Sequence, residues 1–88
     1  MLDRERARAL AREGREMEPT VQVGKRGVTP QVMLELLEQL RRHKLVKVKL
    51  LSGALRDSER EKVLAELALG CKAYLVEARG NTALYFRP

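Results

Sequence analysis

The feature that most constrains this chain is the stretch TVQVGKRGVTP at residues 20–30, where a strand pattern changes into a helix start. Thr20 to Val23 alternates β-forming residues and ends at a glycine, as a short strand does. Thr29 is a good N-cap, and Pro30 suits the first helical position because its missing N–H would lack a partner there anyway. The stretch therefore predicts a short strand, a loop bracketed by glycines and a helix N-terminus.

The predicted loop, Gly24-Lys25-Arg26-Gly27, holds two cations between two glycines. Glycines let backbone N–H groups approach a ligand closely, and the helix start at Thr29 adds unpaired donors and partial positive charge. The loop is therefore a candidate phosphate grip, although on these four residues alone a plain turn with solvated cations is the better explanation. The spacing matches neither the nucleotide P-loop nor the dinucleotide fingerprint. It is closer to the GXXG clamp of some RNA-binding modules, and it does not distinguish RNA from DNA.

The first half of the chain predicts two helices. The first is capped by Asp3, runs to about Glu13 and stops at Gly14. It has a face of mostly small residues suited to close packing and a stripe of arginines that is a solvated face or, at best, an accessory contact surface. The small-residue face is formed by Ala7, Leu10, Ala11 and Gly14. The arginine stripe is formed by Arg4, Arg8 and Arg12. The second helix runs from Pro30 to about His43, with Met33, Leu36, Leu37 and Leu40 on one face.

Residues 44–51, KLVKVKLL, have the period of a strand with one apolar face. Lys47 and Lys49 project from the opposite face, where they either extend the cationic surface of the loop or simply meet solvent. Leu45 and Leu51 lie on the same side as these lysines. We therefore expect another element, such as the first helix, to cover the ends of that side.

The last third of the chain predicts a helix followed by a hairpin. Ser58 and Glu61 fit a capping box, and the helix runs from there to about Leu69 with Gly70 ending it. Two strands at about residues 72–78 and 82–87 are joined by a two-residue turn, Gly80-Asn81. Cys71, between helix and hairpin, is expected to be a small buried apolar residue.

Composition narrows the possible partners. The 88 residues fit one domain, residues 1–88, and 18 Lys and Arg against 12 Asp and Glu give a net charge of +6. This excess favours a polyanion. The aromatic fraction of 3% argues against a stacking platform. A single Cys and a single His disfavour a disulfide, a metal site or a cofactor, and no nucleophile–base set indicates catalysis. With no apolar run long enough for a membrane span, a cytoplasmic protein is expected.

The predicted element order is α-β-α-β-α-β-β. Two strand–helix–strand crossovers imply right-handed connections and mostly parallel neighbours, and the final hairpin adds an antiparallel strand. The expected fold is a compact single α/β domain with a four-stranded mixed sheet and helices packed against it.

Four landmarks in order resemble one known family. They are Pro19 before the valine-rich strand, VGKRGVT at residues 23–29, HKLVKVK at residues 43–49 and GNTALYFRP at residues 80–88. The chain is similar to the CRM domain family (chloroplast RNA splicing and ribosome maturation) in its bacterial single-domain, YhbY-like form. Lys44 stands where that family usually has glutamate, Asn81 replaces a lysine, and Phe86 stands at a tyrosine.

The resemblance implies a fold like the C-terminal domain of bacterial translation initiation factor three. It also implies RNA binding through the glycine loop and association with precursors of the large ribosomal subunit. On that analogy the loop of residues 24–27 is the RNA clamp, with Thr29 beside it, and Lys47, Lys49 and Arg87 are second-rank candidates for extending it. We expect a monomer with no small-molecule substrate. A DNA-binding module and a basic protein-interaction domain are the alternatives.

Overall fold

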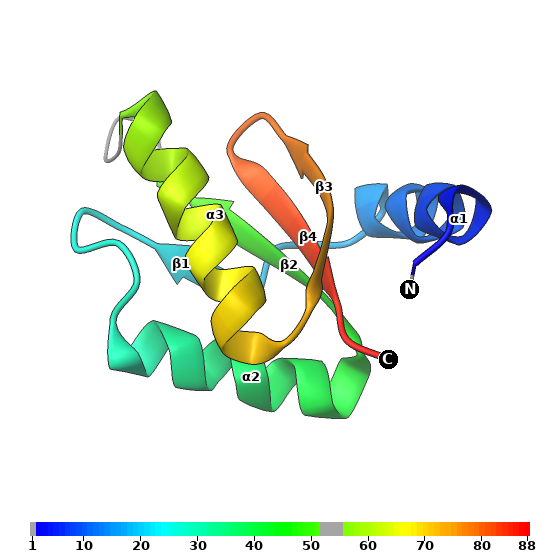
Figure 1. Ribbon diagram of the computed structural model, residues 1–88, viewed down its shortest axis with the longest axis horizontal. Helices are drawn as coiled ribbons and strands as arrows, with labels where there is room; N and C mark the ends of the chain where they lie inside the picture. The colour runs from blue at the N-terminus through cyan, green and yellow to red at the C-terminus, as the bar shows by residue number, and fades with distance from the viewer. Residues whose placement is uncertain (1, 52–55) are drawn as a thin grey trace.

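The computed structural model describes residues 2–51 and 56–88, and the predicted order of elements is confirmed. In chain order they are α1 (Arg4–Arg15), β1 (Val21–Val23), α2 (Pro30–His43), β2 (Leu45–Leu50), α3 (Asp57–Cys71), β3 (Tyr74–Arg79) and β4 (Thr82–Phe86). Figure 1 shows α2 and α3 on one side of the strands and α1 set apart from them.

The four strands form one mixed sheet in the order β1-β2-β4-β3. β1 runs parallel to β2, while β4 is antiparallel to both β2 and β3. The predicted mixed sheet is confirmed, but the prediction of mostly parallel neighbours is wrong. The crossover through α3 does not bring β3 beside β2, because β4 folds back from the hairpin and lies between them. β3 is therefore an outer strand, and its register shifts between Leu75 and Glu77.

The main core lies between the sheet and the pair α2 and α3. Alternate residues of β1, β2 and β4 meet the inward faces of both helices there, and Leu36, Leu67 and Tyr85 are fully buried. The predicted inward face of α2 is confirmed, since Leu36 and Leu40 are buried while Met33 and Leu37 pack against the cluster. This core fixes the position of the connection between β1 and α2.

A smaller cluster lies on the other face of the sheet, under α1. Leu45, Leu84 and Phe86 are buried there, and Leu10 of α1 packs against them. The guanidinium of Arg6 lies 5.1 Å from the centre of the Phe86 ring, within the range of a cation–π contact. The expectation that the first helix covers Leu45 is confirmed. Leu51, the other leucine on that side, is 40% exposed, so the same expectation is wrong for it.

α1 is fastened to β3 by an ion pair. A guanidinium nitrogen of Arg15 lies 2.8 Å from Oε1 of Glu77. This hydrogen bond lowers the pKa of the Glu77 carboxyl. A lowered carboxyl pKa in the folded state stabilises the fold at neutral pH, and this contribution is lost as the pH falls through that pKa.

Two predicted helix starts are confirmed and one is wrong. The Thr29 hydroxyl accepts the N–H of Val32 at 3.2 Å, and an Asp3 carboxylate oxygen accepts the N–H of Arg6 at 2.8 Å. The capping box at Ser58 is not formed. α3 begins two residues earlier than that box predicts, and its N-cap residue Arg56 makes no side-chain capping hydrogen bond.

Two glycines predicted to end helices lie inside them instead. Gly14 belongs to α1 and is buried, and Gly70 belongs to α3. A Cβ atom at Gly14 would overlap the methyl groups of Leu84, so this glycine permits close packing of α1 on the sheet. α3 ends at Cys71, and its C-cap residue Lys72 has a left-handed conformation with φ of 52°. Cys71 is buried as predicted, and burial raises the pKa of its thiol.

Candidate nucleic-acid interface

The loop of residues 24–27 is a tight turn between β1 and α2. The N–H of Gly27 donates to the carbonyl of Gly24 at 2.9 Å, and Gly27 has a φ of 66°. That left-handed conformation favours glycine. Within the described residues, the N–H groups of Lys25, Arg26 and Val28 have no hydrogen-bond partner. The turn therefore presents three backbone N–H donors to a ligand. The N–H of Gly27 is not available to a ligand, because it donates to the carbonyl of Gly24 within the turn.

The two loop cations are both exposed at the tip of the turn. One side of the loop faces α3 across a hollow of about 250 Å³. Glu59, Lys62 and Glu66 of α3 line that hollow together with Lys25 and Arg26. The α3 side of the loop is therefore mixed in charge, and a phosphate approaching there would meet two carboxylates.

Thr29 supports the loop from the helix start. Because its hydroxyl already accepts the N–H of Val32, it closes the first turn of α2. The geometry gives Thr29 a positioning role at the end of the loop.

Lys47 and Lys49 lie on the same face of β2 but in different surroundings. The ammonium of Lys47 donates to the carbonyls of Gly14, at 3.1 Å, and Met17, at 3.3 Å. A cation there satisfies carbonyls at the C-terminal end of α1. Lys49 is exposed and lies one residue before the end of β2, next to the end of β1 from which the loop departs. The structure thus brings Lys49 near the loop and engages Lys47 in holding α1.

Arg87 lies at the other end of β2 from the loop. Its backbone N–H donates to the carbonyl of Lys44 at 2.8 Å. Its side chain lines a hollow at the C-terminal end of α2, which Arg41 also lines. Of the cations predicted to extend the loop, Arg87 is therefore the one the fold places farthest away along the strand.

Two cations at the loop end of the sheet, Arg60 and Arg79, were not predicted. Arg60 of α3 donates to the side-chain carbonyl of Asn81 at 3.1 Å, and the Asn81 backbone carbonyl accepts the N–H of Leu50 at 2.7 Å. Asn81 therefore joins the hairpin tip to α3 and β2. Arg79 pairs with Thr82 and is exposed. The predicted turn at Gly80-Asn81 implies this register, so the sequence contained a signal for Arg79.

The two lysines of β2 give a matched test. Replacing Lys47 by alanine should destabilise the fold by about 1–2 kcal/mol, because two helix-end carbonyls lose their donor. Lys49→Ala should stay within about 0.5 kcal/mol of the wild type, as exposed substitutions usually do. Urea unfolding followed by circular dichroism measures both. Equal unfolding midpoints for the two variants would show that Lys47 does not hold α1.

Other kinds of site have no support in the residues described. No group of three or more His, Cys, Asp or Glu side chains in residues 2–51 and 56–88 could hold a metal ion. In the same ranges, no helix has the length and apolar character needed to cross a membrane.

Comparison with known proteins places this geometry in a family. The model of the CRS1 / YhbY (CRM) domain matches residues 2–87. The probable RNA-binding protein YqeI of Bacillus subtilis is 29% identical over 87 residues, which cover 99% of this chain and 88% of that protein. The probable RNA-binding protein PA4753 of Pseudomonas aeruginosa is 38% identical over 74 residues, covering 84% of this chain and 69% of that protein.

A solved structure confirms the fold. The solution structure of the hypothetical protein SAV1595 from Staphylococcus aureus matches 100% of this chain and 90% of its own, with a TM-score of 0.85 at 22% identity. The match of the domain model over nearly the whole chain agrees with the four landmarks in the sequence. This chain belongs to the CRS1 / YhbY (CRM) domain family.

Proposed function

We propose that this chain is a single RNA-binding domain, residues 1–88, that grips RNA phosphates through the loop of residues 24–27. The observation that carries the proposal is the turn itself, which leads into α2 and presents exposed Lys25 and Arg26 beside three backbone N–H groups that have no partner among residues 2–51 and 56–88. Two relatives described as probable RNA-binding proteins support RNA as the ligand. The net charge of +6 is consistent with such a partner.

The grip combines amide donors with charge. The N–H groups of Lys25, Arg26 and Val28 cradle one phosphate at the positive end of the α2 dipole, while the two side chains neutralise its neighbours. Contacts of this kind position the RNA backbone and read little sequence. Selectivity then comes from RNA shape and single-stranded loops.

Removing the two loop charges tests this mechanism. The variant Lys25→Ala, Arg26→Ala should flatten the slope of log K against log salt by about 1.4 for single-stranded RNA, since each phosphate contact contributes about 0.7. Fluorescence anisotropy over a salt series measures the slope. The matched control is Arg41→Ala, Arg42→Ala, two exposed cations at the far end of α2. The mechanism is wrong if the loop variant keeps the wild-type slope, or if the control loses as much.

We also propose that the RNA is ribosomal RNA in precursors of the large ribosomal subunit, bound in the cytoplasm by a monomer. The resemblance to a ribosome-maturation family supports this assignment. The chain has two Tyr, one Phe and no Trp, so it lacks a platform for stacking many bases and suits surfaces of folded RNA. Assembly intermediates expose such surfaces, and mature subunits bury them.

Sucrose gradients test the ribosomal assignment. At low salt the protein should sediment at or just below the large-subunit position and be absent from mature ribosomes, and its deletion should make precursor particles accumulate. Protein that stays at the top of the gradient, with unchanged subunit profiles on deletion, would leave only general RNA binding. Preference for duplex DNA over structured RNA in direct competition would favour the DNA-binding alternative, and weak binding of any nucleic acid at physiological salt would favour an acidic protein partner.

A further inference from the structure

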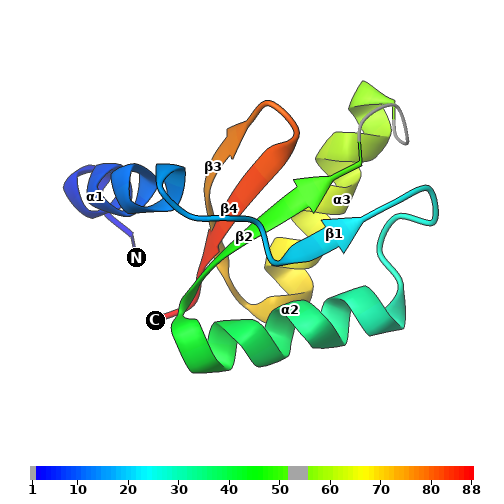
Figure 2. The same cartoon turned by 180° about the vertical axis from the view of Figure 1, so that it is seen from behind.

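One face of the sheet is left partly open beside the loop. The strand register aligns four residues in a row across all four strands, on the face that carries α1: Gln22, Lys49, Thr82 and Arg79. Aligned residues on paired strands point to the same side. α1 covers the other end of that face, at Leu45 and Phe86. Figure 2 shows this face of the sheet, with α1 at one end and the β1–α2 loop at the other.

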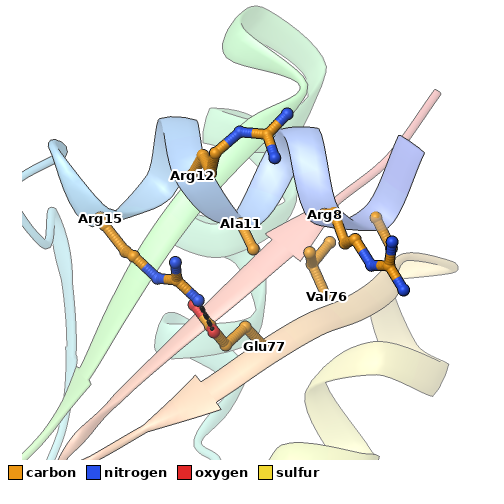
Figure 3. A pocket seen from close by; sticks show the side chains of 7 residues that line it. Arg8, Ala11, Arg12, Arg15, Val76 and Glu77 are labelled. Carbon is orange, nitrogen blue, oxygen red and sulfur yellow. Dashed lines mark hydrogen bonds and ion pairs between the residues drawn. The ribbon is translucent and has the colours of Figure 1, made fainter. Parts of the chain in front are cut away.

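A groove of about 400 Å³ continues from this row between α1 and β3. Arg8, Arg12 and Arg15 line its helix side, and Val76 and Glu77 line its strand side. In Figure 3, Arg15 reaches across to Glu77. Because Arg15 neutralises the one carboxylate that lines the groove, Arg8 and Arg12 leave it with an excess of positive charge.

The open row and the groove are continuous along β3. Glu77 and Arg79 are two residues apart on this strand, a spacing of about 6.6 Å, and point to the same side. Arg79 therefore stands between the end of the groove and Lys49, and Lys49 stands beside the end of β1. Cations thus extend from the loop across the sheet to α1, whereas the α3 side of the loop carries Glu59 and Glu66 along with Lys62.

We propose that the RNA backbone held by the loop continues over Lys49 and Arg79 and enters the α1–β3 groove, where Arg8 and Arg12 bind further phosphates. This path rests on the proposed function, because it begins at the loop. Charge decides the direction. A polyanion leaving the loop over α3 would meet two carboxylates, Glu59 and Glu66, against the single cation Lys62, whereas the charged residues of the open row are cations only and the one carboxylate of the groove is paired. The path makes α1 part of the binding surface and extends the RNA site size well beyond the loop.

The triple variant Arg8→Ala, Arg12→Ala, Arg79→Ala tests the path. With a long single-stranded RNA of about 16 nucleotides, the salt slope should flatten by about 2, since three contacts are lost. With a short RNA of about 4 nucleotides, which the loop alone can hold, the slope should stay unchanged. Lys62→Ala is the matched control, because Lys62 is an exposed cation on the α3 side of the loop. It should bind both RNAs like the wild type.

Lysine at the same three positions keeps the charge and should restore the slope, which separates loss of contacts from misfolding. The path is overturned if the alanine variant, folded by circular dichroism, keeps the wild-type slope with the long RNA. It is also overturned if Lys62→Ala reduces the slope instead, since the RNA would then cross α3. If the variant Lys25→Ala, Arg26→Ala also binds both RNAs like the wild type, the proposed function of the loop is wrong as well. The loop variant therefore distinguishes failure of the path from failure of the proposed function.

Discussion

Replacing Tyr85 by alanine should lower the free energy of unfolding by about 3–5 kcal/mol, as large-to-small changes at buried aromatic residues do. Tyr85 lies in β4 and is fully buried in the main core. Its hydroxyl donates to the carbonyl of Leu64 in α3 at 2.8 Å, so one side chain joins the sheet to the helix above it. Small domains have only about 5–15 kcal/mol in total, so this variant should unfold at a much lower urea concentration.

Tyr85→Phe separates the hydrogen bond from the packing. It keeps the ring and should cost about 1 kcal/mol. It should also change the response to alkaline pH. Burial raises the pKa of the Tyr85 phenol above its ordinary 10.0. The protonated phenol therefore stabilises the fold below pH 10, and this contribution is lost as the pH rises further. The phenylalanine variant should lack that loss. Equal unfolding midpoints for the alanine and phenylalanine variants at pH 7 would contradict the assigned role of the ring.

The two glycines inside helices should respond differently to alanine. Gly14→Ala should destabilise the fold by about 1–3 kcal/mol, because the added Cβ overlaps the buried Leu84 side chain and overpacks the interface. Gly70→Ala also brings a Cβ onto a neighbour, but that neighbour is the end of the flexible and partly buried Met33 side chain. The helix gains about 0.5–1 kcal/mol when glycine becomes alanine, so Gly70→Ala should be near neutral.

Thermal unfolding of the two glycine variants measures this difference, and limited proteolysis locates it. In Gly14→Ala, cleavage should become faster in the segment between α1 and β1, since α1 is displaced from the sheet. Cleavage in Gly70→Ala should match the wild type. The same unfolding temperature for both variants would show that α1 does not pack tightly against Leu84.

The parts of the fold predicted correctly are those fixed by local chemistry. Thr29 and Pro30 define where α2 begins, and the leucines of α2 identify its inward face, because caps and helical periodicity act within a few residues. The alternation Val46-Lys47-Val48 likewise identified β2 and its buried face. The order of the strands could not be predicted in this way. It depends on whether β3 or β4 pairs with β2, and both have suitable residues.

What the sequence could not show about Gly14, Lys47 and the loop depends on tertiary contact or on hydrogen bonding in the folded chain. A glycine after a helical run either ends the helix or permits a close approach, and only the position of Leu84 shows that Gly14 does the second. The interaction of Lys47 with the end of α1 joins residues 33 apart, and no local pattern indicates it. In the loop, the sequence identified the cations and glycines. It could not show which amides are free, because that depends on the hydrogen bond from Gly27 to Gly24.

The central position of β4 has a consequence for how the protein is made. β4 is the last strand in sequence, yet it pairs with both β2 and β3. While residues 82–86 are still being translated, β2 can pair only with β1, and β3 has no partner in the sheet. At about 5–20 residues per second, the nascent chain passes through a stage with helices and a two-stranded ribbon that is marginal by itself. The cooperative sheet forms in one late step, so premature termination before β4 should yield a chain that is degraded rather than a partly active domain.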